Sequence, residues 1–278
     1  MGEGFVTFRE TLEAALVVGI LARYAAPALR GFIWAGVGSA VVLSIAGAWV
    51  LHRVASAHVV WEIALSFSAA VLLISMVVWM QRRSGTLRQE LQTAAQVTEG
   101  WLLFGTSLFA VLREGLETAI FLRALWQMQQ SLSWVGGIAG LLVAVLLGLS
   151  LFLYGRRVPL RPFFRITSVL LLLMAAGMAA YGAHELLELL SSRWAWAEAL
   201  EEAKAWRLFP PTSTPPAAHA WTYTFHEGLY YPLLHHKGWL GGIFHALLGW
   251  RATMSWAELG VWLLTFGLGF WLWRKANR

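Results

Sequence analysis

The sequence carries two copies of one five-residue pattern in which an arginine is followed by two glutamates. The first copy is Arg-Glu-Thr-Leu-Glu at residues 9–13, and the second is Arg-Glu-Gly-Leu-Glu at residues 113–117. Each copy lies in an apolar stretch long enough to cross a bilayer, where one charged side chain costs about 2.5–3.5 kcal/mol on insertion scales. Two matched sets of charges in such places indicate a functional site.

The spacing of the motif places its charged groups on one face of a helix, because residues three and four positions apart are neighbours there. The six residues are Arg9, Glu10, Glu13, Arg113, Glu114 and Glu117. Four carboxylates against two arginines leave an excess of negative charge, and oxygen ligands suit ions such as Fe³⁺, Fe²⁺ or Mn²⁺. The motifs therefore predict a metal-cation site with the glutamates as ligands and the arginines in support.

Three other interpretations of the charged and sulfur-containing residues stay open. The arginines and glutamates could form only an ion-pair lock between helices. Two methionine pairs, Met76 with Met80 and Met174 with Met178, have the thioether chemistry of a Cu⁺ transporter. An intramembrane di-iron enzyme would also place carboxylates on helices, but it typically uses a Glu-x-x-His pattern, which neither motif contains.

A second polar group lies farther along the chain, at His184 and Glu185, with Glu188 one turn later. These residues are candidates for additional metal ligands or for an outer gate. The alternative is a helix end that emerges among lipid headgroups. Histidines between residues 219 and 245 are further candidates for metal capture, or for a solvated surface.

Composition indicates an integral membrane protein. The 278-residue chain is 58% hydrophobic and 13% charged, whereas soluble domains carry about 25% charged residues. Seven helix-length apolar segments are expected, at residues 5–23, 32–51, 59–80, 101–126, 134–154, 163–190 and 256–273. Cysteine is absent, which excludes disulfides and thiolate metal sites. The net charge of +6 is spread over short connections and so does not indicate a nucleic-acid partner.

The order of the segments predicts an inverted repeat. The two motifs lie 104 residues apart, so segments one to three match segments four to six. Three crossings separate the matched segments, which gives the halves opposite orientations, as in many secondary transporters. Arginine and lysine concentrate in the connections after segments one, three and five and at the C-terminus, which predicts an N-out, C-in topology.

We therefore expect an all-α polytopic membrane protein with seven transmembrane helices, built as a 3+3 inverted repeat plus one C-terminal helix. The expected parts are a first three-helix repeat (1–80), a cytoplasmic amphipathic connection (81–100), a second three-helix repeat (101–190), an extracytoplasmic loop (191–255), and a seventh helix with a cytoplasmic tail (256–278).

The residues resemble those of a known family. The stretches around both motifs, the Met-x-x-Trp-Met pattern that ends at residue 80, His184-Glu185, and residues 238–244 are similar to the oxidase-dependent iron permeases. That family includes fungal high-affinity iron permeases and bacterial permeases of three-component uptake systems. Thr11 replaces the commoner glycine of the motif, and the acidic outer-loop motifs of the fungal proteins have no counterpart here.

The resemblance implies import of Fe²⁺ or Fe³⁺ across the cell inner membrane by a protein that is not an enzyme. It implies that Glu10, Glu13, Glu114 and Glu117 handle the ion, with Arg9 and Arg113 in support. Iron is then the transported substrate, with no prosthetic group. The implied partners are the lipid bilayer and periplasmic iron-binding, oxidase or peroxidase proteins.

Overall fold

The computed structural model describes residues 2–55, 58–83, 92–93, 99–129, 133–154, 160–214, 222–226 and 228–276. Within these ranges, seven long helices lie over the seven predicted apolar segments. They are α1 (Gly2–Tyr24), α2 (Arg30–Ala55), α3 (Val59–Arg83), α5 (Gly100–Gln129), α6 (Trp134–Tyr154), α7 (Leu160–Ser191) and α10 (Trp256–Ala276). A short 3-10 turn, η1 (Pro27–Leu29), precedes α2.

Among the described residues, four helical spans are long and apolar enough to cross a membrane, at Pro27–Val54, Val59–Arg82, Arg165–Ser191 and Trp256–Ala276. Helices α1 and α5 are of comparable length, at 23 and 30 residues, but they contain the charged motifs. The protein is thus predominantly helical, as expected of an all-α membrane protein. Of the predicted cytoplasmic connection (81–100), residues 84–91 and 94–98 lie outside the described residues.

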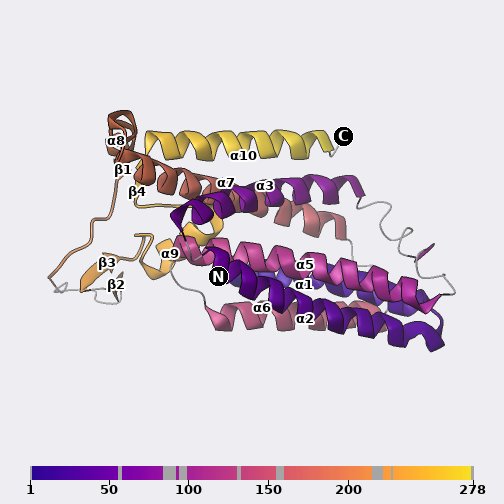
Figure 1. Cartoon of the computed structure of the whole chain (residues 1–278). Coiled ribbons are helices and arrows are strands. Elements are labelled where there is room, and N and C mark those ends of the chain that lie inside the picture. The colour runs from indigo at the N-terminus through magenta and orange to yellow at the C-terminus, as the bar shows by residue number, and fades with distance from the viewer. Residues whose placement is uncertain are drawn as a thin grey trace.

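The helices form an elongated bundle in which the N-terminus and the C-terminus lie at opposite ends (Figure 1). Helix α2 packs along α5, and α1 packs along α6; α1 also contacts α5, and α3 contacts α7. The second helix of each predicted repeat therefore packs on the first helix of the other repeat.

Glycines permit close approach at both of these helix pairs. A Cβ atom at Gly140 would meet the carbonyl oxygen of Gly4, and one at Gly36 would meet Ser107 and the Phe104 carbonyl oxygen. Gly36 and Gly140 are 104 residues apart, the same separation as the two motifs. The close contacts therefore recur at matching positions of the predicted repeats.

The segment between α7 and α10 is a small domain of mixed structure at the N-terminal end of the bundle (Figure 1). It contains α8 (Ala195–Glu202), β1 (Lys204–Arg207), β2 (Tyr223–His226), β3 (Leu229–Pro232), α9 (Trp239–Leu248) and β4 (Thr253–Ser255). Strand β1 pairs with β4, and β2 pairs with β3, both antiparallel. We call the described residues of this segment, 195–214, 222–226 and 228–255, the cap. The sequence predicted neither these strands nor α9.

Helix α8 is separate from α7. A turn at residues 192–193 and an extended backbone at Trp194 interrupt the helix. Helix α8 then packs back against α7.

Candidate metal site

The two motifs meet where α1 and α5 cross the middle of the bundle. The helices are antiparallel, since Gly2 at the start of α1 lies beside Leu125 near the end of α5. One carboxylate oxygen from each of Glu10, Glu13 and Glu114 lies within 4.8 Å of the other two. Two helices, distant in sequence, thus supply one group of carboxylates.

Arg9 is buried within this group, with 1% of its side chain exposed. Its Nη1 lies 2.7 Å from Glu10 Oε1, and its Nη2 lies 2.7 Å from Glu13 Oε1. One guanidinium therefore joins both carboxylates of its own motif and fixes their spacing.

The same guanidinium also contacts two thioethers from α3. Arg9 Nη1 donates to Met76 Sδ at 2.9 Å, and Nη2 donates to Met80 Sδ at 2.7 Å. The sequence suggested these methionines as Cu⁺ ligands. In the structure their sulfur atoms face a positive charge instead, and so they position Arg9.

Arg113 is held differently from Arg9. Its Nε lies 2.7 Å from Glu117 Oε1, and its guanidinium lies over the ring of Trp79, 4.5 Å from the ring centroid. Its side chain is 40% exposed. Helix α3 therefore contacts both arginines, one through methionines and one through a tryptophan. Sequence reasoning missed the role of Trp79, although the residue stands between the two methionines in the chain.

Several carboxylate oxygens in the group have no hydrogen bond. Among the described residues, Glu10 Oε2, Glu114 Oε2 and Glu117 Oε2 are buried without a hydrogen-bond partner. Buried charged oxygens are costly unless they are paired or bind a metal ion. The arginines thus satisfy only part of the group, which leaves oxygens of suitable chemistry for a cation.

His184 and Glu185 lie apart from the motif carboxylates. They form a separate group with Glu188 near the end of α7. His184 and Glu185 line a cavity of about 700 Å³ between the helix ends and the cap, which we call the vestibule. Its wall also includes Glu3, Gln127, Tyr181, His226, His245 and Arg251.

The vestibule and the motif site lie along the same face of α1. Glu3 is seven residues before Glu10, which places the two side chains on one helix face about 10 Å apart along the axis. Glu3 is buried and accepts a hydrogen bond from the Ser133 backbone N–H at 3.1 Å. The α1 face that lines the cavity thus continues to the carboxylate group.

Two histidines of the cap, His235 and His236, have structural roles. His235 Nδ1 accepts the Lys237 N–H at 3.1 Å, and His236 Nδ1 accepts the Ala252 N–H at 3.3 Å. Burial lowers the pKa of His235 to about 4 and that of His236 to about 2, with neighbouring cations adding to both shifts. Both rings are therefore neutral at physiological pH and brace the cap.

The fold and the site together define a helical membrane protein with a buried carboxylate group suited to a metal cation. Comparison with known proteins is more specific: the chain belongs to the Iron permease FTR1 family, whose model matches residues 1–269. It is 34% identical over 191 residues to the ferrous iron permease EfeU of Yersinia pestis, covering 63% of this chain and 68% of that protein.

Two further relatives cover nearly the whole chain. A ferrous iron permease EfeU of Escherichia coli O6:H1 is 29% identical over 276 residues, which is 93% of this chain and 90% of that protein. An uncharacterized protein of Archaeoglobus fulgidus is 31% identical over 268 residues, which is 93% of this chain and 89% of that protein. No solved structure matches.

Proposed function

We propose that this chain imports iron across the cell inner membrane through the carboxylate group formed by its two motifs. The ligands are Glu10, Glu13, Glu114 and Glu117, and Arg9 and Arg113 hold them in place. The observation that carries the proposal is that oxygens from Glu10, Glu13 and Glu114 gather within 4.8 Å, inside otherwise apolar helices.

Fe²⁺ is the proposed substrate. Relatives at 34% and 29% identity are named ferrous iron permeases, and carboxylate oxygens accept Fe²⁺. One runner-up substrate, Cu⁺, fits less well. Cu⁺ would need the sulfur atoms of Met76 and Met80, which already face the Arg9 guanidinium. Mn²⁺ shares the oxygen chemistry and is a competitor that transport assays should include.

The proposed architecture has seven crossings, an inverted repeat, and an N-out, C-in topology. The matched pairs α2 with α5 and α1 with α6 support the repeat. The N-terminus and the cap lie at one end of the bundle and the C-terminus at the other, which supports the topology (Figure 1). Iron would enter from the vestibule, bind between α1 and α5, and leave inward as the repeats rearrange.

The membrane potential supplies a sufficient driving force in this scheme. A divalent cation that crosses fully gains about 4.6 kcal/mol per 100 mV, because each elementary charge gains about 2.3 kcal/mol. Periplasmic iron-binding, oxidase or peroxidase proteins are the proposed partners that deliver the ion to the vestibule. Iron is the transported substrate in this proposal, which includes no prosthetic group.

Transport by purified protein tests this function. Protein reconstituted in liposomes should take up radioactive Fe²⁺, and faster with an inside-negative potential. Glu13→Gln and Glu117→Gln should each abolish uptake, because each replaces a carboxylate by a neutral group of the same shape. Glu198→Gln, at an exposed glutamate on α8, is the matched control and should transport normally. Normal uptake by both motif variants would overturn the proposal.

A further inference from the structure

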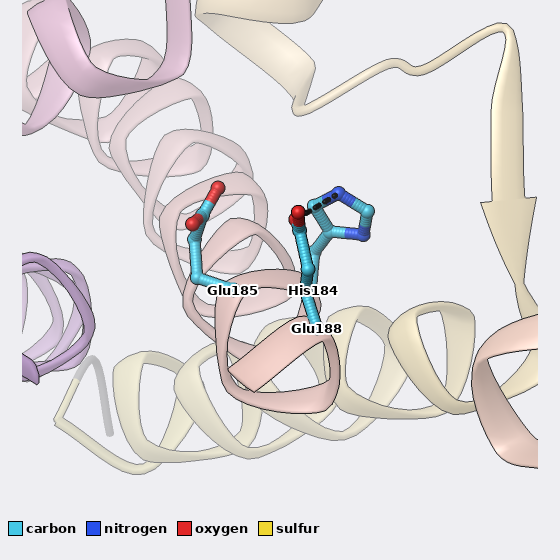
Figure 2. A group of neighbouring side chains, drawn as sticks. All are labelled: His184, Glu185 and Glu188. Carbon is cyan, nitrogen blue, oxygen red and sulfur yellow. Dashed lines mark ion pairs between the residues drawn. The ribbon is translucent and has the colours of Figure 1, made fainter. Parts of the chain in front are cut away.

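A second group of metal-ligating side chains lies at the vestibule end of α7, away from the motif site. His184, Glu185 and Glu188 each offer one nitrogen or oxygen atom, and these atoms lie within 4.8 Å of one another. Figure 2 shows the three side chains on their helix, where a dashed line joins His184 Nε2 to Glu188 Oε2, 3.8 Å apart. Imidazole and carboxylate together suit a divalent transition-metal ion.

A buried carboxylate from another helix fixes the orientation of His184. The Nδ1 atom of His184 lies 3.1 Å from Oε1 of Glu258, at the start of α10. Since a carboxylate can only accept, Nδ1 carries the proton, and Nε2 of a neutral ring keeps its lone pair. That Nε2 atom is the one that faces Glu188, 3.8 Å from Oε2. Metal-binding histidines almost always have such a partner on the other ring nitrogen.

Glu258 is itself held firmly in place. Its side chain is 1% exposed, and its Oε1 accepts the Ser255 hydroxyl at 3.0 Å, while the Glu258 N–H donates to Ser255 Oγ at 3.2 Å. This reciprocal pair caps the N-terminus of α10. Arg251 Nη1 lies 3.5 Å from Oε2 and balances the buried charge. Helix α10 thus presents a preorganised hydrogen-bond acceptor to His184, and this acceptor is separate from the acidic residues on α7.

The group is also accessible to an ion from solution. Glu188 is 65% exposed, whereas His184 and Glu185 line the vestibule. The cavity reaches Glu3 and Tyr181, and the α1 face below Glu3 leads to Glu10. An ion at His184 would therefore stand between the exterior and the motif carboxylates.

We propose that His184 Nε2 and carboxylate oxygens of Glu185 and Glu188 form a second binding site for a divalent first-row transition-metal ion. Glu258 is its positioning residue. The site loads the ion into the vestibule before it reaches the motif carboxylates. The loading role rests on the proposed transport function, whereas the binding itself does not.

Metal titration of the intact protein in nanodiscs tests the site, with Co²⁺ as a spectroscopic substitute for Fe²⁺. Wild-type protein should bind two ions, and the Glu13→Gln/Glu117→Gln variant should bind one at the same concentrations. Adding His184→Ala to that variant should remove the remaining visible absorption. With Mn²⁺ in place of Co²⁺, the pulsed EPR signal of a coordinated nitrogen should disappear with the same substitution.

Two milder variants and one control guard against a folding defect. Glu188→Gln changes an exposed side chain and should weaken Co²⁺ binding without changing thermal stability. Glu258→Gln should weaken binding about 10- to 100-fold, the usual effect of removing a partner of a metal-bound histidine. His226→Ala removes another histidine of the same cavity and should leave Co²⁺ affinity unchanged.

Unchanged Co²⁺ affinity in the folded Glu188→Gln and His184→Ala variants would overturn the second site. Equal weakening by His226→Ala would also overturn it, because binding would then belong to the cavity as a whole. The two proposals fail separately. Motif variants that block transport while His184→Ala has no effect on Co²⁺ would leave only the proposed function standing.

Discussion

At the residue scale, the decisive feature is the way α3 holds the arginines of the motifs. Arg9 contacts the sulfur atoms of Met76 and Met80, and Arg113 lies over Trp79. With these contacts, the arginines pair with some carboxylate oxygens of the motifs, while other carboxylate oxygens remain without a hydrogen bond. A motif that served only as an ion-pair lock would not explain these unpaired carboxylate oxygens, because a buried unpaired oxygen is costly.

Met76→Leu should reduce iron uptake without abolishing it. The substitution keeps the volume of the side chain but removes one acceptor from Arg9. A loss of about 0.5–1.5 kcal/mol corresponds to a reduction of about 2- to 12-fold. Liposome uptake measures the effect, and Met174→Leu, in the apolar core between the helices, is the control. An equal reduction by Met174→Leu would contradict a specific role of Met76.

The same variant separates iron from copper as the cargo. If the sulfur of Met76 only positions Arg9, Met76→Leu should leave the preference for Fe²⁺ over Cu⁺ unchanged in competition assays. Selective loss of Cu⁺ uptake would instead favour the copper interpretation.

At the element scale, glycines set the distance between α1 and α6. Gly140 lies against the backbone of Gly4, whereas a Cβ at Gly137, on the same helix, would meet only the Thr7 hydroxyl at 3.9 Å. Helix α6 can therefore tolerate a methyl group at one glycine and not at the other.

Gly140→Ala should lower the thermal unfolding midpoint, because the added methyl forces the helices apart at a cost of roughly 1–3 kcal/mol. Gly137→Ala should leave the midpoint equal or slightly higher, since alanine favours helix by up to about 1 kcal/mol. Thermal unfolding in detergent provides the comparison. A stable Gly140→Ala protein would show that α1 and α6 are farther apart than described.

The cap should loosen in acid because two of its histidines, His235 and His236, are buried or partly buried. Burial lowers the pKa of His235 to about 4 and of His236 to about 2, from a usual value of 6.5. The unfolded cap then binds more protons than the folded one, so stability is complete above pH 6.5 and falls as the pH drops toward 4. Hydrogen exchange of residues 228–255 should accelerate over that range. His236→Gln should reduce the pH dependence, and equal dependence in the variant would contradict this cause.

At the scale of the whole molecule, the two ends of the bundle differ. The N-terminus, the vestibule and the cap share one end, and the C-terminus lies at the other (Figure 1). This difference between the ends fits an import path in which one end receives the ion and the other releases it. Which end receives the ion depends on the orientation of the protein in the membrane.

Cysteine labelling should establish that orientation, because the chain contains no cysteine. A membrane-impermeant maleimide should label Ala199→Cys, in the exposed part of α8, on intact spheroplasts. It should label Lys275→Cys, at the exposed end of α10, only after permeabilisation. The reverse pattern would place the cap inside and overturn the N-out topology.

The long helices and the acidic character of the motifs follow from the amino-acid sequence alone. Long apolar runs specify helices whatever their neighbours are, and i,i+3 and i,i+4 spacing places Glu10, Glu13 and Arg9 on one face. A helix lies over every predicted apolar segment. The strands of the cap were not predicted, because their sequences are short and show little alternation of apolar and polar residues.

The residues of other helices that meet these faces are known only from the way the helices pack. Helical periodicity fixes the direction of a side chain around its own axis but says nothing of the partner across the interface. The sequence left Met76 and Met80 open as copper ligands, and only the packing of α3 against α1 shows that they contact Arg9. Glu258 lies 74 residues from His184 in the chain, and only packing of α10 against α7 makes it the partner of that imidazole.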